Sequence, residues 1–136
     1  HYIYSGTKGN YKETDTIFPV NGYAWSKLGG EASVNLYKNS LILRLCMTEK
    51  PFVHKKAFTN VKTNFIFHED AVPIIFKLLN CKGIINIGGK KQTIYNFVKK
   101  NNKKIKKTLA KKNQIPLNST LNLRKMKLSI KNSKLD

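Results

Sequence analysis

Tyr23 and Lys27 are the residues of this sequence whose types and spacing best suit catalysis. They lie four residues apart in a segment predicted to be helical over roughly residues 22–38, and positions i and i+4 share one face of a helix. An ammonium beside a phenol stabilises the phenolate, which suits the phenol to exchange a proton with a carbonyl oxygen. The other donors of Lys27 can bind a hydroxyl of the same ligand. The pair therefore predicts acid/base chemistry at a carbonyl group.

The Tyr-x-x-x-Lys spacing also occurs elsewhere in the chain, so the spacing alone does not identify a site. Tyr4 and Lys8 enclose Gly6 and are predicted to lie in a loop, whereas Tyr95 precedes a lysine run that is typical of a solvated face. An ordinary amphipathic helix with a surface Tyr–Lys pair is the alternative for Tyr23 as well. The residues that flank Tyr23 have to decide between these interpretations.

Those flanking residues resemble a known active-site helix. The segment Pro19-Val-Asn-Gly22 followed by Tyr-x-x-Ser-Lys-Leu-x-Gly-Glu31 is similar to the active-site helix of extended short-chain dehydrogenases/reductases, above all the dTDP-4-dehydrorhamnose reductase group. The resemblance implies that Tyr23 is the catalytic acid/base and that Lys27 binds the nicotinamide ribose of NADPH or NADH. It also implies reduction of the keto group of a nucleotide-linked 4-keto-6-deoxysugar, and a homodimer formed through this helix.

Three further segments resemble the same family in the same order: a loop at residues 6–15, a strand at residues 83–89, and residues 116–126 leading into a last helix. The Ser or Thr that polarises the substrate carbonyl in the family normally lies just before the position of His1. No Gly-x-x-Gly-x-x-Gly follows a strand, so the cofactor phosphates have no predicted helix N-terminus. We therefore expect an α/β fold that forms the C-terminal part of a Rossmann-like extended short-chain reductase and is inactive alone. A non-catalytic binding protein of the same fold is the alternative.

The predicted organisation is a single partial domain over residues 1–136. Residues 1–47 should form the end of the nucleotide-binding fold with the active-site helix, and residues 48–136 the substrate-binding portion and the C-terminal basic segment. A strand should end at residues 1–4, Asp70 should cap a helix that runs through Leu79, and Thr93 should cap another.

The apolar run at residues 41–47 predicts a strand buried on both faces of a parallel sheet. The resemblance places the nicotinamide at the end of this strand, which implicates Cys46 and Met47 in cofactor binding, although a packed core strand explains both residues equally well. Residues 48–62 are predicted to be loop. There the resemblance implies that His54, Lys55 and Lys56 meet the diphosphate of the substrate; the alternative is that they are solvated.

The predicted active-site helix has a regular apolar pattern. Hydrophobic residues recur at helical spacing, at Trp25, Leu28, Ala32 and Leu36. Gly29-Gly30 inside the helix should cost about 1 kcal/mol per residue relative to Ala. We therefore expect close packing of these glycines against another backbone as compensation.

The net charge of +19 is unevenly distributed. Residues 82–136 hold 16 Lys and Arg against Asp136 alone, a net +15, and residues 99–112 form a basic low-complexity stretch. Such a segment can hold phosphate backbones, so a nucleic-acid-binding domain is a further alternative. Against it, the sequence has two arginines, its aromatics are not interleaved with the lysines, and a general bias toward Lys, Asn and Ile explains the charge. Nucleic acid is therefore not an expected partner.

The remaining residue types exclude several other classes. Cys46 and Cys81 have neither metal-ligand nor disulfide-framework spacing, and the three histidines show no ligand pattern, so we expect reduced thiols and no metal site. No apolar run approaches membrane-spanning length. The chain begins with His and no apolar leader precedes it, from which we expect a cytoplasmic protein without a membrane partner, or a piece of one.

Overall fold

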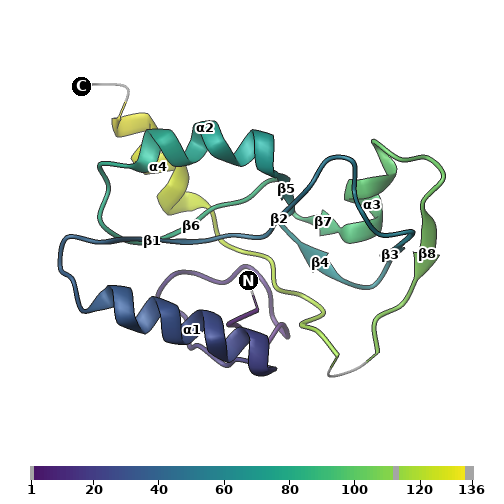
Figure 1. Ribbon diagram of the computed structural model, residues 1–136, viewed down its shortest axis with the longest axis horizontal. Coiled ribbons are helices and arrows are strands. Elements are labelled where there is room, and N and C mark those ends of the chain that lie inside the picture. The colour runs from purple at the N-terminus through teal and green to yellow at the C-terminus, as the bar shows by residue number, and fades with distance from the viewer. Residues whose placement is uncertain (1, 112–113, 134–136) are drawn as a thin grey trace.

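The computed structural model describes residues 2–111 and 114–133; His1 of the predicted strand and Lys112 of the basic stretch lie outside them. The described residues form four helices and eight short strands, and five of the strands follow one another between the first two helices (Figure 1). The helices are α1 (Gly22–Asn35), α2 (His68–Leu78), α3 (Ile94–Lys99) and α4 (Arg124–Asn132). The strands are β1 (Leu41–Arg44), β2 (Met47–Thr48), β3 (Lys56–Phe58), β4 (Lys62–Thr63), β5 (Ile66–Phe67), β6 (Gly83–Asn86), β7 (Gln92–Thr93) and β8 (Lys106–Thr108).

The parallel pair β1–β6 forms the centre of a three-layer arrangement. Leu41 is in register with Gly83 and Arg44 with Asn86. Figure 1 shows α2 and α4 on one side of the pair and α1 on the other. Between the pair and α2/α4 lies a hydrophobic cluster that includes Leu78, Ile85, Ile87 and Met126. Helices on both faces of a parallel sheet are the arrangement that the α/β prediction required.

The apolar run at residues 41–47 was predicted to be one strand buried on both faces, and this is wrong. The run is divided between β1, which pairs with β6, and β2, which pairs with β5. Along β1 buried residues alternate with half-buried ones, and Met47 in β2 is 48% exposed. The alternation arises because β1 is less completely covered than the centre of a large parallel sheet would be.

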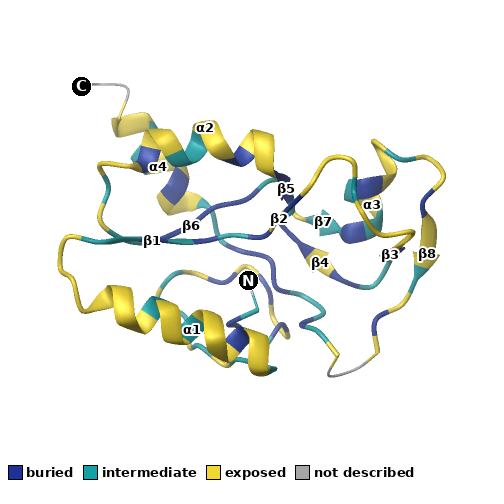
Figure 2. Cartoon of the chain, viewed as in Figure 1, coloured by how far each residue is buried: buried dark blue, intermediate teal, exposed yellow. Residues whose placement is uncertain are grey.

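Helix α1 begins where the sequence indicates but packs differently. The Asn21 side chain caps it by accepting a hydrogen bond from the Ala24 N–H at 2.9 Å. The apolar residues at helical spacing do not form one buried stripe: Leu28 packs against a hydrophobic cluster that includes Tyr4 and Leu121, whereas Trp25 and Leu36 are 60% and 83% exposed. Figure 2 shows α1 as largely exposed. A Cβ on Gly29 or Gly30 would meet no atom within 4 Å in the structure, so the expected close packing is not made within the described residues.

Two predicted element ends are also wrong. Residues 2 and 3 form a turn instead of a strand end, because no neighbouring strand pairs with them in the described part of the chain. Asp70 does not cap α2, which begins at His68 and has Phe67 as its cap residue without a side-chain hydrogen bond. Asp70 instead lies in the first turn, where a carboxylate still interacts favourably with the helix dipole. Thr93, in contrast, caps α3 as predicted, accepting from the Asn96 N–H at 3.1 Å.

A second unit contains β3, α3 and β8. The predicted loop at residues 48–62 contains β3, and the lysine-rich stretch contains β8; the two pair in parallel, with Lys56 in register with Lys106. Their shared hydrophobic cluster comprises Ala57, Val61, Ile94, Val98, Ile105 and Ala110. Pairing across about fifty residues cannot be read from local sequence, which explains why both strands were missed.

No helix in the described ranges has the length and apolarity needed to cross a bilayer.

Candidate active site

A cavity of about 1390 Å³ lies between α1, the ends of β1 and β2, and the β3–β8 pair. Every residue for which the sequence predicted a catalytic, cofactor or substrate role lines this cavity: Tyr23, Lys27, Cys46, Met47, His54, Lys55 and Lys56. They come from three separate elements, α1, β2 and β3, and from the two connections on either side of β2. The fold therefore brings the candidates together, and their individual roles stay predictions.

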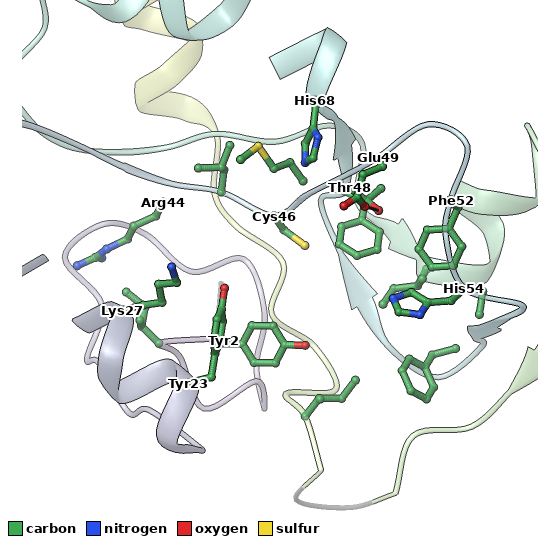
Figure 3. A pocket seen from close by; sticks show the side chains of 18 of the residues that line it. Tyr2, Tyr23, Lys27, Arg44, Cys46, Thr48, Glu49, Phe52, His54 and His68 are labelled. Carbon is green, nitrogen blue, oxygen red and sulfur yellow. Dashed lines mark hydrogen bonds between the residues drawn. The ribbon is translucent and has the colours of Figure 1, made fainter. Parts of the chain in front are cut away.

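Tyr23 and Lys27 stand on the side of α1 that faces Cys46 (Figure 3). Tyr23 is 59% exposed, so a ligand in the cavity can reach its hydroxyl. The Lys27 Nζ lies 5.3 Å from the centroid of the Tyr23 ring, as the i, i+4 spacing predicts. A phenol and an ammonium thus share one wall of the cavity and can act on neighbouring atoms of one ligand.

Cys46 and Met47 follow β1 and line the same cavity. Burial raises the pKa of the Cys46 thiol to about 12, and the nearby Thr63 hydroxyl offsets only part of this effect. Cys46 is therefore a neutral thiol at physiological pH and not a nucleophile. Met47 offers a half-exposed apolar surface. Together they form a wall suited to an uncharged ring, in keeping with the predicted nicotinamide contact.

The other end of the cavity is cationic and aromatic. The His54 ring packs edge-on against Phe52 with centroids 5.3 Å apart. Lys55 and Lys56 are exposed, and neither forms an ion pair within the described residues. Lysines without a carboxylate partner can bind a phosphate group as point charges.

Solved structures similar to this chain were found, whereas no family model and no curated protein sequence matches it. A hypothetical dTDP-4-dehydrorhamnose reductase from Sulfolobus tokodaii is 27% identical with a TM-score of 0.78, over 93% of this chain and 55% of that chain. The dTDP-4-dehydrorhamnose reductase of Bacillus anthracis, solved with NADP, gives 18% and 0.77 over the same shares. A UDP-glucuronic acid 4-epimerase from Bacillus cereus, solved with NAD, gives 20% and 0.72, over 96% of this chain and 52% of that chain.

This chain has the fold of an extended short-chain dehydrogenase/reductase. The resemblance inferred from Tyr23, Lys27 and their neighbours is thereby confirmed, as is the Rossmann-like α/β class. The chain spans about half the length of the solved structures it matches.

Sequence reasoning missed several polar and aromatic residues that line this cavity, among them Tyr2, Thr48 and Glu49. Thr48 and Glu49 lie where β2 ends, and the Thr48 hydroxyl donates to Glu49 Oε2 at 3.4 Å. Ligands of open α/β sheets bind at the carboxyl ends of strands, so polar residues right after an apolar run were a usable signal. Tyr2 packs edge-on against Tyr23 with centroids 5.7 Å apart. Burial, followed by the effects of Cys46 and Tyr23, raises the pKa of Tyr2, so its hydroxyl stays protonated.

A largely buried ion pair at the edge of this cavity was also missed. Arg44 at the end of β1 binds the Glu31 carboxylate of α1. Burial by itself would lower the pKa of Arg44, but the hydrogen bonds and charges of Glu31 and Tyr4 together outweigh it and raise that pKa. The guanidinium therefore stays ionised, and the pair ties α1 to the sheet. Among the described residues no three His, Cys, Asp or Glu side chains form a group that could hold a metal ion.

Proposed function

We propose that this chain forms the acid/base and substrate-binding part of an NAD(P)-dependent reductase. Its substrate is the keto group of a nucleotide-linked 4-keto-6-deoxysugar, of the dTDP-4-dehydrorhamnose type. The observation that carries the proposal is a single cavity with Tyr23 and Lys27 at one wall, and with His54 and the cationic residues Lys55 and Lys56 at its other end. A sugar ring beside Tyr23 and Lys27, with its diphosphate beside Lys55 and Lys56, fits this arrangement.

Reduction of a ketone requires a hydride at carbon and a proton at oxygen. A nicotinamide cofactor, NADPH or NADH, supplies the hydride when bound. Tyr23 donates its phenolic proton to the carbonyl oxygen as the alkoxide develops, and the Lys27 ammonium stabilises the resulting phenolate. The spare donors of Lys27 suit the hydroxyls of the nicotinamide ribose, and the neutral wall of Cys46 and Met47 suits the nicotinamide ring.

The two parts of the chain have different roles in this proposal. Residues 1–47 contribute the active-site helix at the edge of the nucleotide-binding fold, and residues 48–136 contribute the substrate portion. Two solved relatives contain NADP or NAD, and the chain covers about half of each. The rest of the nucleotide-binding fold must then be supplied for activity, so the chain alone does not turn over. The exposed Trp25 of α1 and the exposed Leu36 just beyond its end support the homodimer contact. The proposed location is the cytoplasm.

The test is a chimera that joins this chain to the part of the Sulfolobus tokodaii reductase that it does not cover. The chimera should oxidise NADPH or NADH in the presence of dTDP-4-dehydrorhamnose, and Tyr23→Phe should abolish this. Tyr37→Phe is the matched control, because Tyr37 is 73% exposed just beyond α1 and does not line the cavity.

Two results would contradict the proposal. Turnover by the isolated chain that Tyr23→Phe abolishes would show that no further part is needed. A folded chimera that binds the nucleotide sugar but never oxidises cofactor would favour the non-catalytic binding protein.

A further inference from the structure

Glu31 lies on α1 one turn beyond Lys27 and lines the same cavity. Oppositely charged side chains at positions i and i+4 of a helix stand on the same face and attract each other. Among the described residues, however, Glu31 pairs with Arg44, and the Lys27 ammonium lies over the Tyr23 ring. The Glu31 carboxylate thus competes with the Tyr23 ring for the Lys27 ammonium, and its ion pair with Arg44 prevents that contact.

Arg44 occupies both oxygens of the Glu31 carboxylate. Its Nε donates to Oε2 at 3.0 Å, and its Nη2 donates to Oε1. The two side chains are 4% and 12% exposed, so solvent weakens this pairing little. A bidentate guanidinium–carboxylate pair is stronger and more specific in geometry than a contact through one ammonium. The Glu31 carboxylate therefore pairs with Arg44 and not with Lys27.

The rest of the fold sets the position of Arg44. Its Nη1 donates to the Tyr4 hydroxyl at 2.7 Å and to the Glu13 carbonyl oxygen at 3.0 Å. The Tyr4 ring in turn stacks on Tyr11, with centroids 4.4 Å apart and planes 9° apart. The guanidinium is therefore a fixed anchor at the end of β1, to which the Glu31 carboxylate of α1 is drawn.

We propose that Arg44 is a positioning residue, which keeps the Lys27 ammonium at Tyr23 by sequestering the Glu31 carboxylate. Without the guanidinium, the carboxylate is released to Lys27, which stands one turn back on the same helix face. Lys27 then swings away from the phenol. The catalytic meaning of this arrangement rests on the proposed function, but the arrangement itself does not.

The test measures the contact between Lys27 and Tyr23 in the full chain, as nuclear Overhauser effects between the Lys27 ε-methylene protons and the Tyr23 ring protons. Arg44→Met should reduce these effects severalfold. Glu31→Gln should preserve them, because a neutral amide does not capture an ammonium. The double variant Arg44→Met/Glu31→Gln should restore them. A merely structural role of Arg44 predicts no recovery in the double variant, because the Arg44–Tyr4 hydrogen bond is missing there as well.

Unchanged Overhauser effects in folded Arg44→Met would overturn the proposal, as would a folded double variant without recovery. Folding is checked by circular dichroism and by the fluorescence of Trp25, the one tryptophan of the sequence. If Arg44→Met does not fold, Arg44→Lys takes its place, because a single ammonium does not reproduce the two-pronged contact. A loss that Glu31→Gln then reverses supports the proposal, and an unchanged contact refutes it.

Activity of the chimera separates this proposal from the proposed function. If the Lys27–Tyr23 contact responds as expected but the chimera has no reductase activity, only the proposed function is refuted. If the chimera is fully active but Arg44→Met leaves the Lys27–Tyr23 contact unchanged, only the positioning role is refuted.

Discussion

The Tyr2 ring meets the Tyr23 ring edge-on, with an interplanar angle of 84°. The Lys27 ammonium contacts the same Tyr23 ring at 5.3 Å from its centroid. Tyr23 is therefore held by an aromatic edge from the N-terminal turn and by a cation from its own helix. Edge-to-face pairs of this kind contribute about 0.5–1.5 kcal/mol beyond the area they bury, enough to restrict the orientation of the phenol.

Replacing Tyr2 should therefore affect catalysis through Tyr23. Tyr2→Ala removes the ring edge and should lower kcat of the chimera by about tenfold, since a misplaced acid/base group loses near-attack geometry. Tyr2→Phe retains the ring and should retain most of the activity. Steady-state kinetics of both variants check this. An equal loss in Tyr2→Phe would assign the effect to the hydroxyl instead of the ring edge.

The cationic end of the cavity should bind a diphosphate. Replacing Lys55 and Lys56 together by Ala should weaken binding of dTDP to this chain by about tenfold or more, and the wild-type affinity should fall with added salt. Isothermal titration calorimetry measures both effects. Replacing Lys127 and Lys131 together by Ala is the matched control, because both exposed lysines lie on α4 and neither lines the cavity. A loss of the same size in the control would show that only net charge matters.

Stability should depend on the buried thiol at alkaline pH. Burial raises the pKa of Cys46 from 9.0 to about 12, so the unfolded chain releases this proton at a lower pH than the folded chain does. The contribution of Cys46 to the free energy of unfolding is complete below pH 9 and is lost as the pH rises toward 12. Urea unfolding of wild type and Cys46→Ala should show a stability difference that shrinks over this range. A difference independent of pH would contradict the shifted thiol.

Two glycines should respond to Ala in opposite directions. Gly6 has a φ of +75°, and its Cβ would stand 2.2 Å from the Pro116 Cβ, so Gly6→Ala should lower the free energy of unfolding by about 2 kcal/mol. Gly30 lies in α1 with open space around it, so Gly30→Ala should raise that free energy by about 1 kcal/mol. Urea titration of the monomeric chain measures both. A destabilising Gly30→Ala would indicate a partner packed on α1.

Local chemistry explains what could be predicted from sequence. The i, i+4 spacing of Tyr23 and Lys27 places both on one helix face whatever surrounds the helix, and Thr93 caps α3 through a hydrogen bond within four residues. The order of family-like segments identified the reductase fold for the same reason, because each segment is a short local pattern. Errors at Asp70 and in the apolar stripe of α1 arose where tertiary packing overrode local preference.

The sequence by itself thus determined the fold class, the candidate acid/base pair and seven of the residues that line the cavity. Tertiary structure decided which groups surround that pair. In the folded chain the Tyr2 ring packs against Tyr23, Glu31 forms its ion pair with Arg44 instead of Lys27, and β3 pairs with β8. These contacts join residues far apart in the chain, and their partners are chosen by how the layers pack, which no local periodicity or spacing encodes.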